Sequence, residues 1–112
     1  MRRARPLIVG AGPAGCAAAI ALGRAGAAPV LLDRDETARD PLCGGFLSWR
    51  TLAQLAALGI DPHRLGGHRV TRLRLLAGRR EVVLALPAPA CGLSRHALDS
   101  ALRAAAEAAG AQ

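Results

Sequence analysis

The sequence contains no lysine and no tyrosine, and it has only one phenylalanine and one tryptophan. All fifteen of its basic residues are therefore arginine, and the formal net charge is +7. Surfaces that bind nucleic acid more often combine basic residues with aromatic side chains on which bases stack, whereas the arginines here are scattered along the chain. We interpret the charge as a solvated arginine-rich surface and expect no nucleic-acid partner.

Long apolar runs and cysteine clusters are also missing. No stretch of eighteen apolar residues is free of charge, glycine and proline, so we expect no membrane-spanning helix. Cys16, Cys43 and Cys91 are too far apart for a CxxC site, and no cluster of His, Cys, Asp or Glu has metal-ligand spacing, so we expect no metal. An odd number of cysteines without disulfide density favours a reducing compartment, and we expect a cytoplasmic protein.

The chain begins with the basic segment MRRARP, followed by LIVGAGPAGCAAAIALGRAG at residues 7–26. Together with the small residues 25–27, this could be a secretion signal. Such a signal needs a continuous apolar helix of about 7–15 residues. The apolar run at residues 7–9 stops at three glycines and Pro13, which would break that helix. We therefore favour a different interpretation of the same letters.

Residues 7–26 satisfy the requirements of a strand, a glycine-rich turn and a helix that bind a nucleotide. The strand at residues 7–9 leads into G-x-G-x-x-G, formed by Gly10, Gly12 and Gly15. The first glycine allows a tight turn, the second lets the backbone approach a pyrophosphate, and the third lets helix and strand touch. The free N–H groups and the dipole of the helix start would then face the anion.

A second strand is expected at residues 29–32, after Gly26 has ended the helix. It leads to Asp33, which lies 23 residues after Gly10. A carboxylate at that strand end can accept hydrogen bonds from both hydroxyls of a ribose. The sequence therefore predicts a site for a dinucleotide cofactor.

Three stretches resemble one known family. They are GAGPAG with the later LLDR, CGGFLSWRTL at residues 43–52, and LSRHALDSAL at residues 93–102. In this order they resemble FAD-dependent oxidoreductases of the p-hydroxybenzoate-hydroxylase type, and within them the geranylgeranyl-reductase-like branch. The resemblance covers nearly all 112 residues. It implies an α/β fold, an incomplete Rossmann-like FAD/NAD(P)-binding domain with an inserted antiparallel β-hairpin.

The resemblance also implies roles for individual residues. The residues that would wrap the FAD pyrophosphate are Gly10, Gly12, Pro13, Ala14 and Gly15. Asp33 would bind the adenosine ribose, Arg34 would lie beside the adenine, and Arg95 would contact the flavin nucleotide. The residues that would approach the isoalloxazine ring are Cys43, Gly44 and Gly45. Three of these residues have an alternative role. Cys43 could be a small buried residue and Arg95 a solvated helix residue, whereas Arg34 could bind the 2′-phosphate of NADP.

Three further elements are expected. Ser48 is a good N-cap for a helix over about residues 48–58, and a helix over about residues 94–109 ends at Gly110. Alternating apolar and basic residues predict a hairpin over about residues 69–86, whose second strand is broken by Pro87-Ala88-Pro89.

We expect a third parallel strand, the rest of the domain and a substrate domain to be missing from these residues. We therefore expect residues 1–112 to be the N-terminal part of one FAD-binding domain, unstable, inactive and a poor binder of FAD when isolated.

The function expected from the resemblance is the FAD-binding portion of a flavin-dependent reductase or monooxygenase. NAD(P)H would donate the electrons, and the substrate would be a small isoprenoid, aromatic or polyketide-like molecule. Such a substrate could be lipid-like, which leaves peripheral membrane contact open. No residue can be named as a catalytic acid or base. The alternatives are a truncated, non-catalytic nucleotide-binding module and an NAD-dependent dehydrogenase.

Overall fold

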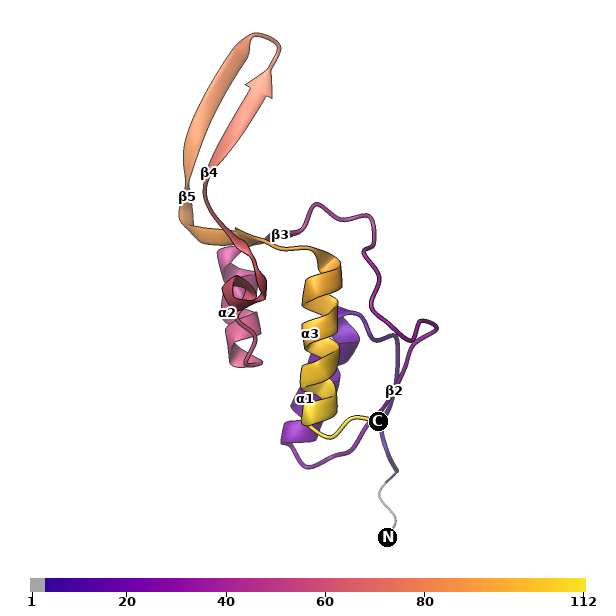
Figure 1. Cartoon of the computed structure of the whole chain (residues 1–112). Helices are drawn as coiled ribbons and strands as arrows, with labels where there is room; N and C mark the ends of the chain where they lie inside the picture. Colours follow the sequence, from indigo (N-terminus) through magenta and orange to yellow (C-terminus); the bar gives the residue numbers. More distant parts are fainter. Residues whose placement is uncertain (1–3) are drawn as a thin grey trace.

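The structure is a computed structural model that describes residues 4–112, so the first three residues of the basic start lie outside the described part. Figure 1 shows a small α/β body from which a long two-stranded ribbon extends. In chain order the elements are β1 (Leu7–Val9), α1 (Pro13–Arg24), β2 (Val30–Leu32), β3 (Phe46–Leu47), α2 (Trp49–Ala57), a 3-10 helix (Pro62–Leu65), β4 (His68–Ala77), β5 (Arg80–Gly92) and α3 (Arg95–Ala108).

The body is built on a parallel strand pair. β1 and β2 run side by side with Ile8 opposite Leu31, and α1 connects them. Gly26 follows the end of α1 with a φ of +83°, a left-handed conformation that glycine adopts without steric cost. The expected Rossmann-like start, in a mixed α/β fold with an antiparallel hairpin, is confirmed.

The core lies between α1, α3 and the parallel pair and extends to β3, α2 and the end of β5. Cys16 and Ile20 of α1 and Leu102 of α3 are almost fully buried. The two helices approach so closely that a Cβ at Gly23 would collide with the carbonyl oxygen of Ala109. Because small residues line this contact, α3 is held firmly against the first helix and can present its N-terminal half to the site.

The edge of β2 that faces away from β1 carries one further contact. The N–H of Leu31 donates to the carbonyl of Gln112 at 2.8 Å, and the N–H of Gln112 donates to Pro29 at 3.1 Å. This pair of bonds is the repeat unit of a parallel ladder. Within the described residues this sheet has two strands, and Gln112 adds one pair of hydrogen bonds at the outer edge of β2.

The second sheet is antiparallel and has the order β3-β5-β4. The prediction that Pro87 and Pro89 break the second hairpin strand is wrong, because β5 runs through both. Val70 lies opposite Ala90 but Arg72 lies opposite Ala85, so residues 86–89 bulge out opposite a single residue of β4. Proline lacks the N–H that a ladder needs, and a bulge is where that loss is tolerated. The short strand β3, which pairs with the end of β5, was not anticipated.

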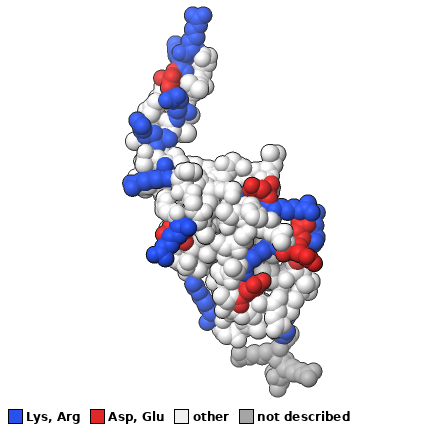
Figure 2. Space-filling model, in the orientation of Figure 1, with Lys and Arg blue, Asp and Glu red and all other residues white. Residues whose placement is uncertain are grey.

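Beyond the bulge, β4 and β5 form a ribbon with two different faces. The register puts Leu73 opposite Leu84 and Leu75 opposite Val82, and these four side chains share one exposed face. Arg72 lies on the other face with Arg74, which is 2.9 Å from Glu81. Figure 2 shows arginine side chains distributed along this extension. Within residues 4–112, no helix combines the length and the apolar character needed to cross a bilayer.

Candidate functional site

The glycine-rich turn lies at the carboxyl end of β1 and is tied to the end of β2. The N–H of Gly10 donates to the carbonyl of Leu32 at 2.7 Å, and the φ of Gly10 is +102°, a value that favours glycine. A Cβ at Gly15 would collide with the carbonyl oxygen of Gly10, so only glycine lets α1 start this close to the turn.

The space above this turn is open. A Cβ placed at Gly10 or at Gly12 would meet no atom within 4 Å. α1 starts with Pro13 directly after Gly12, has no side-chain cap and has no acidic residue in its first turn. The N–H groups of Ala14 and Gly15 belong to that first turn, where no carbonyl of the helix can accept them. The turn therefore fits the pyrophosphate of a dinucleotide such as FAD.

Asp33 follows β2 and faces the turn. Its Oδ2 accepts a hydrogen bond from the N–H of Ala11 at 2.8 Å, and its Oδ1 accepts one from the N–H of Asp35 at 2.9 Å. The bond from Asp35, and then the one from Ala11, holds the pKa of this carboxyl below its ordinary value. The carboxylate is thus ionised and oriented. The Arg34 side chain is 90% exposed and lies near Asp35, at 3.8 Å.

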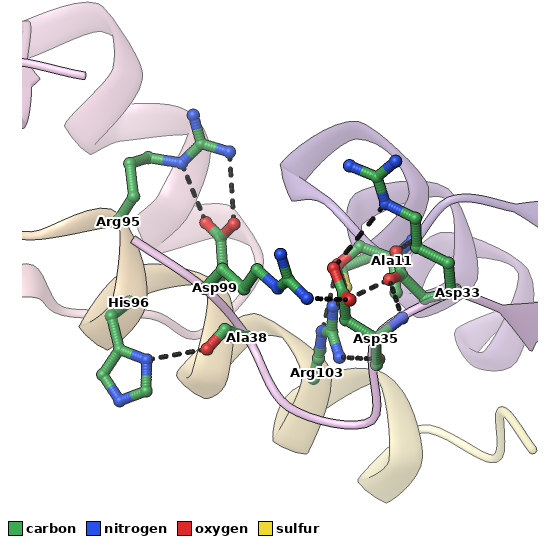
Figure 3. Close-up of polar contacts among 11 residues, drawn as sticks. Ala11, Asp33, Asp35, Ala38, Arg95, His96, Asp99 and Arg103 are labelled. Carbon is green, nitrogen blue, oxygen red and sulfur yellow. Dashed lines mark hydrogen bonds and ion pairs between the residues drawn. The ribbon is translucent and has the colours of Figure 1, made fainter. Parts of the chain in front are cut away.

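A second arginine, which the sequence motifs did not single out, lies closer to this carboxylate. Arg103 of α3 has its Nη2 3.4 Å from Asp33 Oδ1, and its side chain is only 20% exposed (Figure 3). It is 70 residues away from Asp33 in the chain. No local pattern could have found it, because the helix packing alone brings the two together.

Residues 43–45 form a second cluster with the start of α3. Gly45 has a φ of +70°, its carbonyl accepts the N–H of Leu93 at 2.8 Å, and a Cβ there would lie 2.6 Å from the Leu93 carbonyl oxygen. The N–H of Gly45 donates to the sulfur of Cys43 at 3.4 Å. Cys43 is exposed, and a Cβ at Gly44 would meet nothing within 4 Å. The backbone at Gly44 is therefore open, whereas Gly45 is buried against Leu93.

Arg95 lies in the first turn of α3, beside this cluster. Its Nε and Nη2 donate to the two carboxylate oxygens of Asp99 at 3.0 and 3.1 Å, a bidentate pair one helical turn apart. The pKa of Arg95 is raised, chiefly by this hydrogen bonding to Asp99, and the nearby Cys43 thiol raises it further. The plain alternative of a solvated arginine does not describe this side chain, which is 27% exposed and paired.

Each cluster borders a cavity. A cavity of about 810 Å³ lies over residues 43–45, and a cavity of about 440 Å³ lies beside the glycine-rich turn and Asp33. Both are lined by Asp40 and Pro41. The two cavities therefore adjoin at the loop that carries these two residues.

His96 fixes the loop that joins the clusters. Its ring Nδ1 lies 2.9 Å from the carbonyl oxygen of Ala38 (Figure 3). Its main-chain N–H donates to the Asp40 carboxylate at 3.2 Å. Arg39, in the same loop, pairs with Asp35 at 2.9 Å and so belongs to the Asp33 end. Among residues 4–112, no three His, Cys, Asp or Glu side chains gather as metal ligands do.

The chain is similar to several curated proteins. It is 35% identical to a menaquinone reductase of Mycobacterium tuberculosis over 95% of this chain and 27% of the relative. It is also 35% identical to a menaquinone reductase of Mycolicibacterium smegmatis, over 98% of this chain and 28% of the relative. The chain thus spans about a quarter of the length of the curated relatives it matches.

Solved structures show the same fold. A flavin-dependent brominase superposes with a TM-score of 0.81 at 20% identity, over 95% of this chain and 27% of that one. A geranylgeranyl bacteriochlorophyll reductase-like protein of Thermoplasma acidophilum gives 0.77 at 24% identity, over 96% and 28%. A flavin-dependent monooxygenase solved with FAD and substrate gives 0.67 at 26% identity, over 99% and 23%.

The fold, the open glycine-rich turn and the oriented Asp33 agree with one family assignment. The sequence matches the FAD binding domain family over residues 3–112, which is almost its whole length. The resemblance to FAD-dependent oxidoreductases is thereby confirmed, and this chain belongs to the FAD binding domain family.

Proposed function

We propose that the native protein carrying this chain is an FAD-dependent reductase that takes electrons from NAD(P)H and acts on an isoprenoid, quinone-like substrate. The observation that carries this proposal is a surface with two cavities, one beside the glycine-rich turn and one over residues 43–45, which share Asp40 and Pro41 in a chain 35% identical to menaquinone reductases. The two ends of that surface differ in chemistry, as the two halves of FAD do.

Each end suits one half of the cofactor. The N–H groups of Ala14 and Gly15 would bind the pyrophosphate, and the Asp33 carboxylate would accept the hydroxyls of the adenosine ribose. Arg34 would flank the adenine. The bound flavin supplies the redox chemistry by accepting electrons from the donor and passing them to the substrate.

The other end of the surface would receive the flavin. Gly44 and the exposed Cys43 leave space for the ring, and Arg95, oriented by Asp99, would contact the flavin nucleotide. Pro13, at the first position of α1, would keep the pyrophosphate end rigid. This chain contributes binding and orientation, and we assign it no acid or base.

The test of this function is a measurement on the purified native gene product. We expect the visible absorption bands of oxidised flavin, loss of those bands when NADH or NADPH is added without oxygen, and their return when menaquinone is added. Comparing the rates of flavin reduction by NADH and by NADPH gives the preferred electron donor. A bound nicotinamide in place of flavin would instead identify an NAD-dependent dehydrogenase, and bound nucleotide without any turnover of donor or substrate would identify a non-catalytic nucleotide-binding module.

Monooxygenation is the second candidate, because the monooxygenase solved with FAD and substrate aligns over 99% of this chain at 26% identity. The two reactions differ in their use of oxygen. A reductase consumes NAD(P)H with its substrate under anaerobic conditions, whereas a monooxygenase requires one O₂ per hydroxylated product. Oxygen-electrode traces with menaquinone and with aromatic test substrates distinguish them.

A lipid-like substrate would bring this protein to a membrane surface from the cytoplasm. The β4–β5 ribbon supports this part of the proposal, because it exposes Leu73, Leu75, Val82 and Leu84 on one face, with Arg72 and Arg74 on the opposite face. Apolar side chains with neighbouring arginines suit an anionic interface. Co-sedimentation with phosphatidylglycerol vesicles, but not with phosphatidylcholine vesicles, is the expected result. Recovery in the periplasmic or secreted fraction would contradict a cytoplasmic location.

A further inference from the structure

Arg103 connects three segments of the site. Its Nη1 donates to the carbonyl of Asp35 at 3.0 Å and its Nε donates to the carbonyl of Ala11 at 3.3 Å, while its Nη2 lies 3.4 Å from Asp33 Oδ1 (Figure 3). The glycine-rich turn, the end of β2 and the following loop thus meet at one guanidinium. No sequence motif and none of the roles proposed above uses this residue.

We propose that Arg103 is a positioning residue for the adenosine half of FAD, which orients the Asp33 carboxylate and compensates its charge when the adenosine covers it. This inference rests on the proposed FAD site. It concerns a residue that would act through Asp33, not one that would contact the substrate.

The hydrogen-bond geometry at Asp33 leaves room for a ribose. A carboxylate can accept about four hydrogen bonds. Ala11 uses one position on Oδ2, Asp35 uses one on Oδ1, and Arg103 lies against the Oδ1 side. The capacity that remains is largest on Oδ2, which faces the turn where the cofactor would enter.

Arg103 is itself held independently of Asp33. Its bonds to the carbonyls of Asp35 and Ala11 would remain if the Asp33 side chain rotated. The fixed guanidinium of Arg103 therefore stabilises one orientation of the Asp33 carboxylate. A carboxylate held in that position before the ligand arrives loses less conformational freedom on binding, which tightens the complex.

The charges around Asp33 explain why an arginine is needed here. Within residues 4–112, Arg103 is the one cation within 4 Å of the Asp33 carboxylate. The Arg34 side chain is mostly exposed, and Arg39 forms an ion pair with Asp35. The other titratable groups near Asp33, from α1, α3 and the loop, are acidic or neutral: Cys16, Asp35, Glu36, Asp40, Asp99 and Glu107.

Covering this carboxylate with adenosine removes water from it. A charge that loses its water without a partner is strongly disfavoured and tends to bind a proton instead. Arg103 already helps to keep the pKa of Asp33 low, behind the main-chain bonds from Asp35 and Ala11. In the complex its share of this stabilisation would grow, because charges interact more strongly when water is excluded.

The test compares Arg103→Met, which removes the charge, with Arg103→Lys, which keeps it, in the native gene product freed of flavin. Dissociation constants for FAD and for FMN, which lacks the adenosine, are measured from about pH 5 to about pH 8. We expect Arg103→Met to raise the Kd for FAD about tenfold at neutral pH, and by a further severalfold towards low pH, while the Kd for FMN stays unchanged. Arg103→Lys should stay within about threefold of the parent at every pH.

Arg64→Met is the matched control, because Arg64 is 89% exposed and lies on the 3-10 helix away from the turn. Equal losses of FAD and FMN affinity, or no loss of FAD affinity, would overturn the inference. If Arg103→Met fails to fold, Arg103→Gln replaces it, and a pH profile for FAD as flat as that of the parent would overturn the inference in the same way. A parent protein that binds no FAD would contradict the proposed function instead.

Discussion

The main-chain N–H of Ala11 donates a 2.8 Å hydrogen bond to the side chain of Asp33. This bond joins the glycine-rich turn after β1 to the acidic residue after β2. The two parts of the candidate site therefore form one unit in which a change at either residue affects the other.

The charge of Asp33 can be removed by Asp33→Asn. The amide keeps the shape but can no longer act as an anion toward the ribose hydroxyls and Ala11, so we expect FAD affinity to fall about tenfold to a hundredfold. Fluorescence titration of the flavin-free native protein measures the loss. Glu81→Gln on the distant ribbon should leave the Kd unchanged, and a similar loss in both variants would contradict a specific role for Asp33.

The same carboxylate makes stability depend on pH in a defined direction. Hydrogen bonds from Asp35 and Ala11 lower the pKa of Asp33 in the folded protein below its ordinary value of 3.8. Its contribution to the free energy of unfolding is therefore complete above that value and is lost as the pH falls through the lower, folded-state pKa. Acid unfolding curves of the parent and of Asp33→Asn should converge at the acid end, and an NMR titration should place the Asp33 pKa below 3.8.

The glycines of the turn should separate stability from binding. A Cβ at Gly15 would collide with the Gly10 carbonyl, so Gly15→Ala should lower the free energy of unfolding by about 1–3 kcal/mol. Gly12 has a φ of −78° and open space around it, so Gly12→Ala should unfold like the parent but bind FAD more weakly. Thermal unfolding and FAD titration of the two variants check this, and equal melting temperatures would contradict it.

Asp99 is a buried carboxylate, 7% exposed, whose ion-pair partner is Arg95. Arg95→Met leaves that charge unpaired and should destabilise the fold by about 1–3 kcal/mol. The double variant Arg95→Met with Asp99→Leu should recover part of the loss, because no charge then remains buried. Denaturant unfolding of the single and double variants measures the coupling, and strictly additive effects would show that the pair contributes nothing.

The three thiols should differ in reactivity. Cys43 is exposed, whereas Cys16 and Cys91 are buried, and burial raises the pKa of both buried thiols. A small alkylating reagent should modify Cys43 first, and bound FAD should slow this step if the ring lies over residues 43–45. Cys43→Ser should remove the fast phase. A fast phase that FAD does not protect would place the ring elsewhere.

Local sequence was sufficient to predict the glycine-rich turn and the position of Asp33 at the end of β2, because glycines and short apolar strands directly determine the backbone conformation there. It was not sufficient for Arg103, whose partners at Ala11 and Asp35 lie 92 and 68 residues away. It also misplaced the end of β5, because Pro87 was expected to end a strand. The bulge that accommodates this proline depends on the pairing partner, and local propensity does not specify that partner.

The ribbon also affects how copies of this protein behave in a crowded solution. In residues 4–112 the edge of β4 that faces away from β5 carries no further strand, and its neighbouring face is apolar. Such an edge can template pairing between molecules. The net charge of +7 makes two copies repel each other, and salt at about 0.1 M screens this repulsion at separations beyond about 10 Å. We therefore expect copies of this chain to associate less in dilute buffers than in concentrated ones.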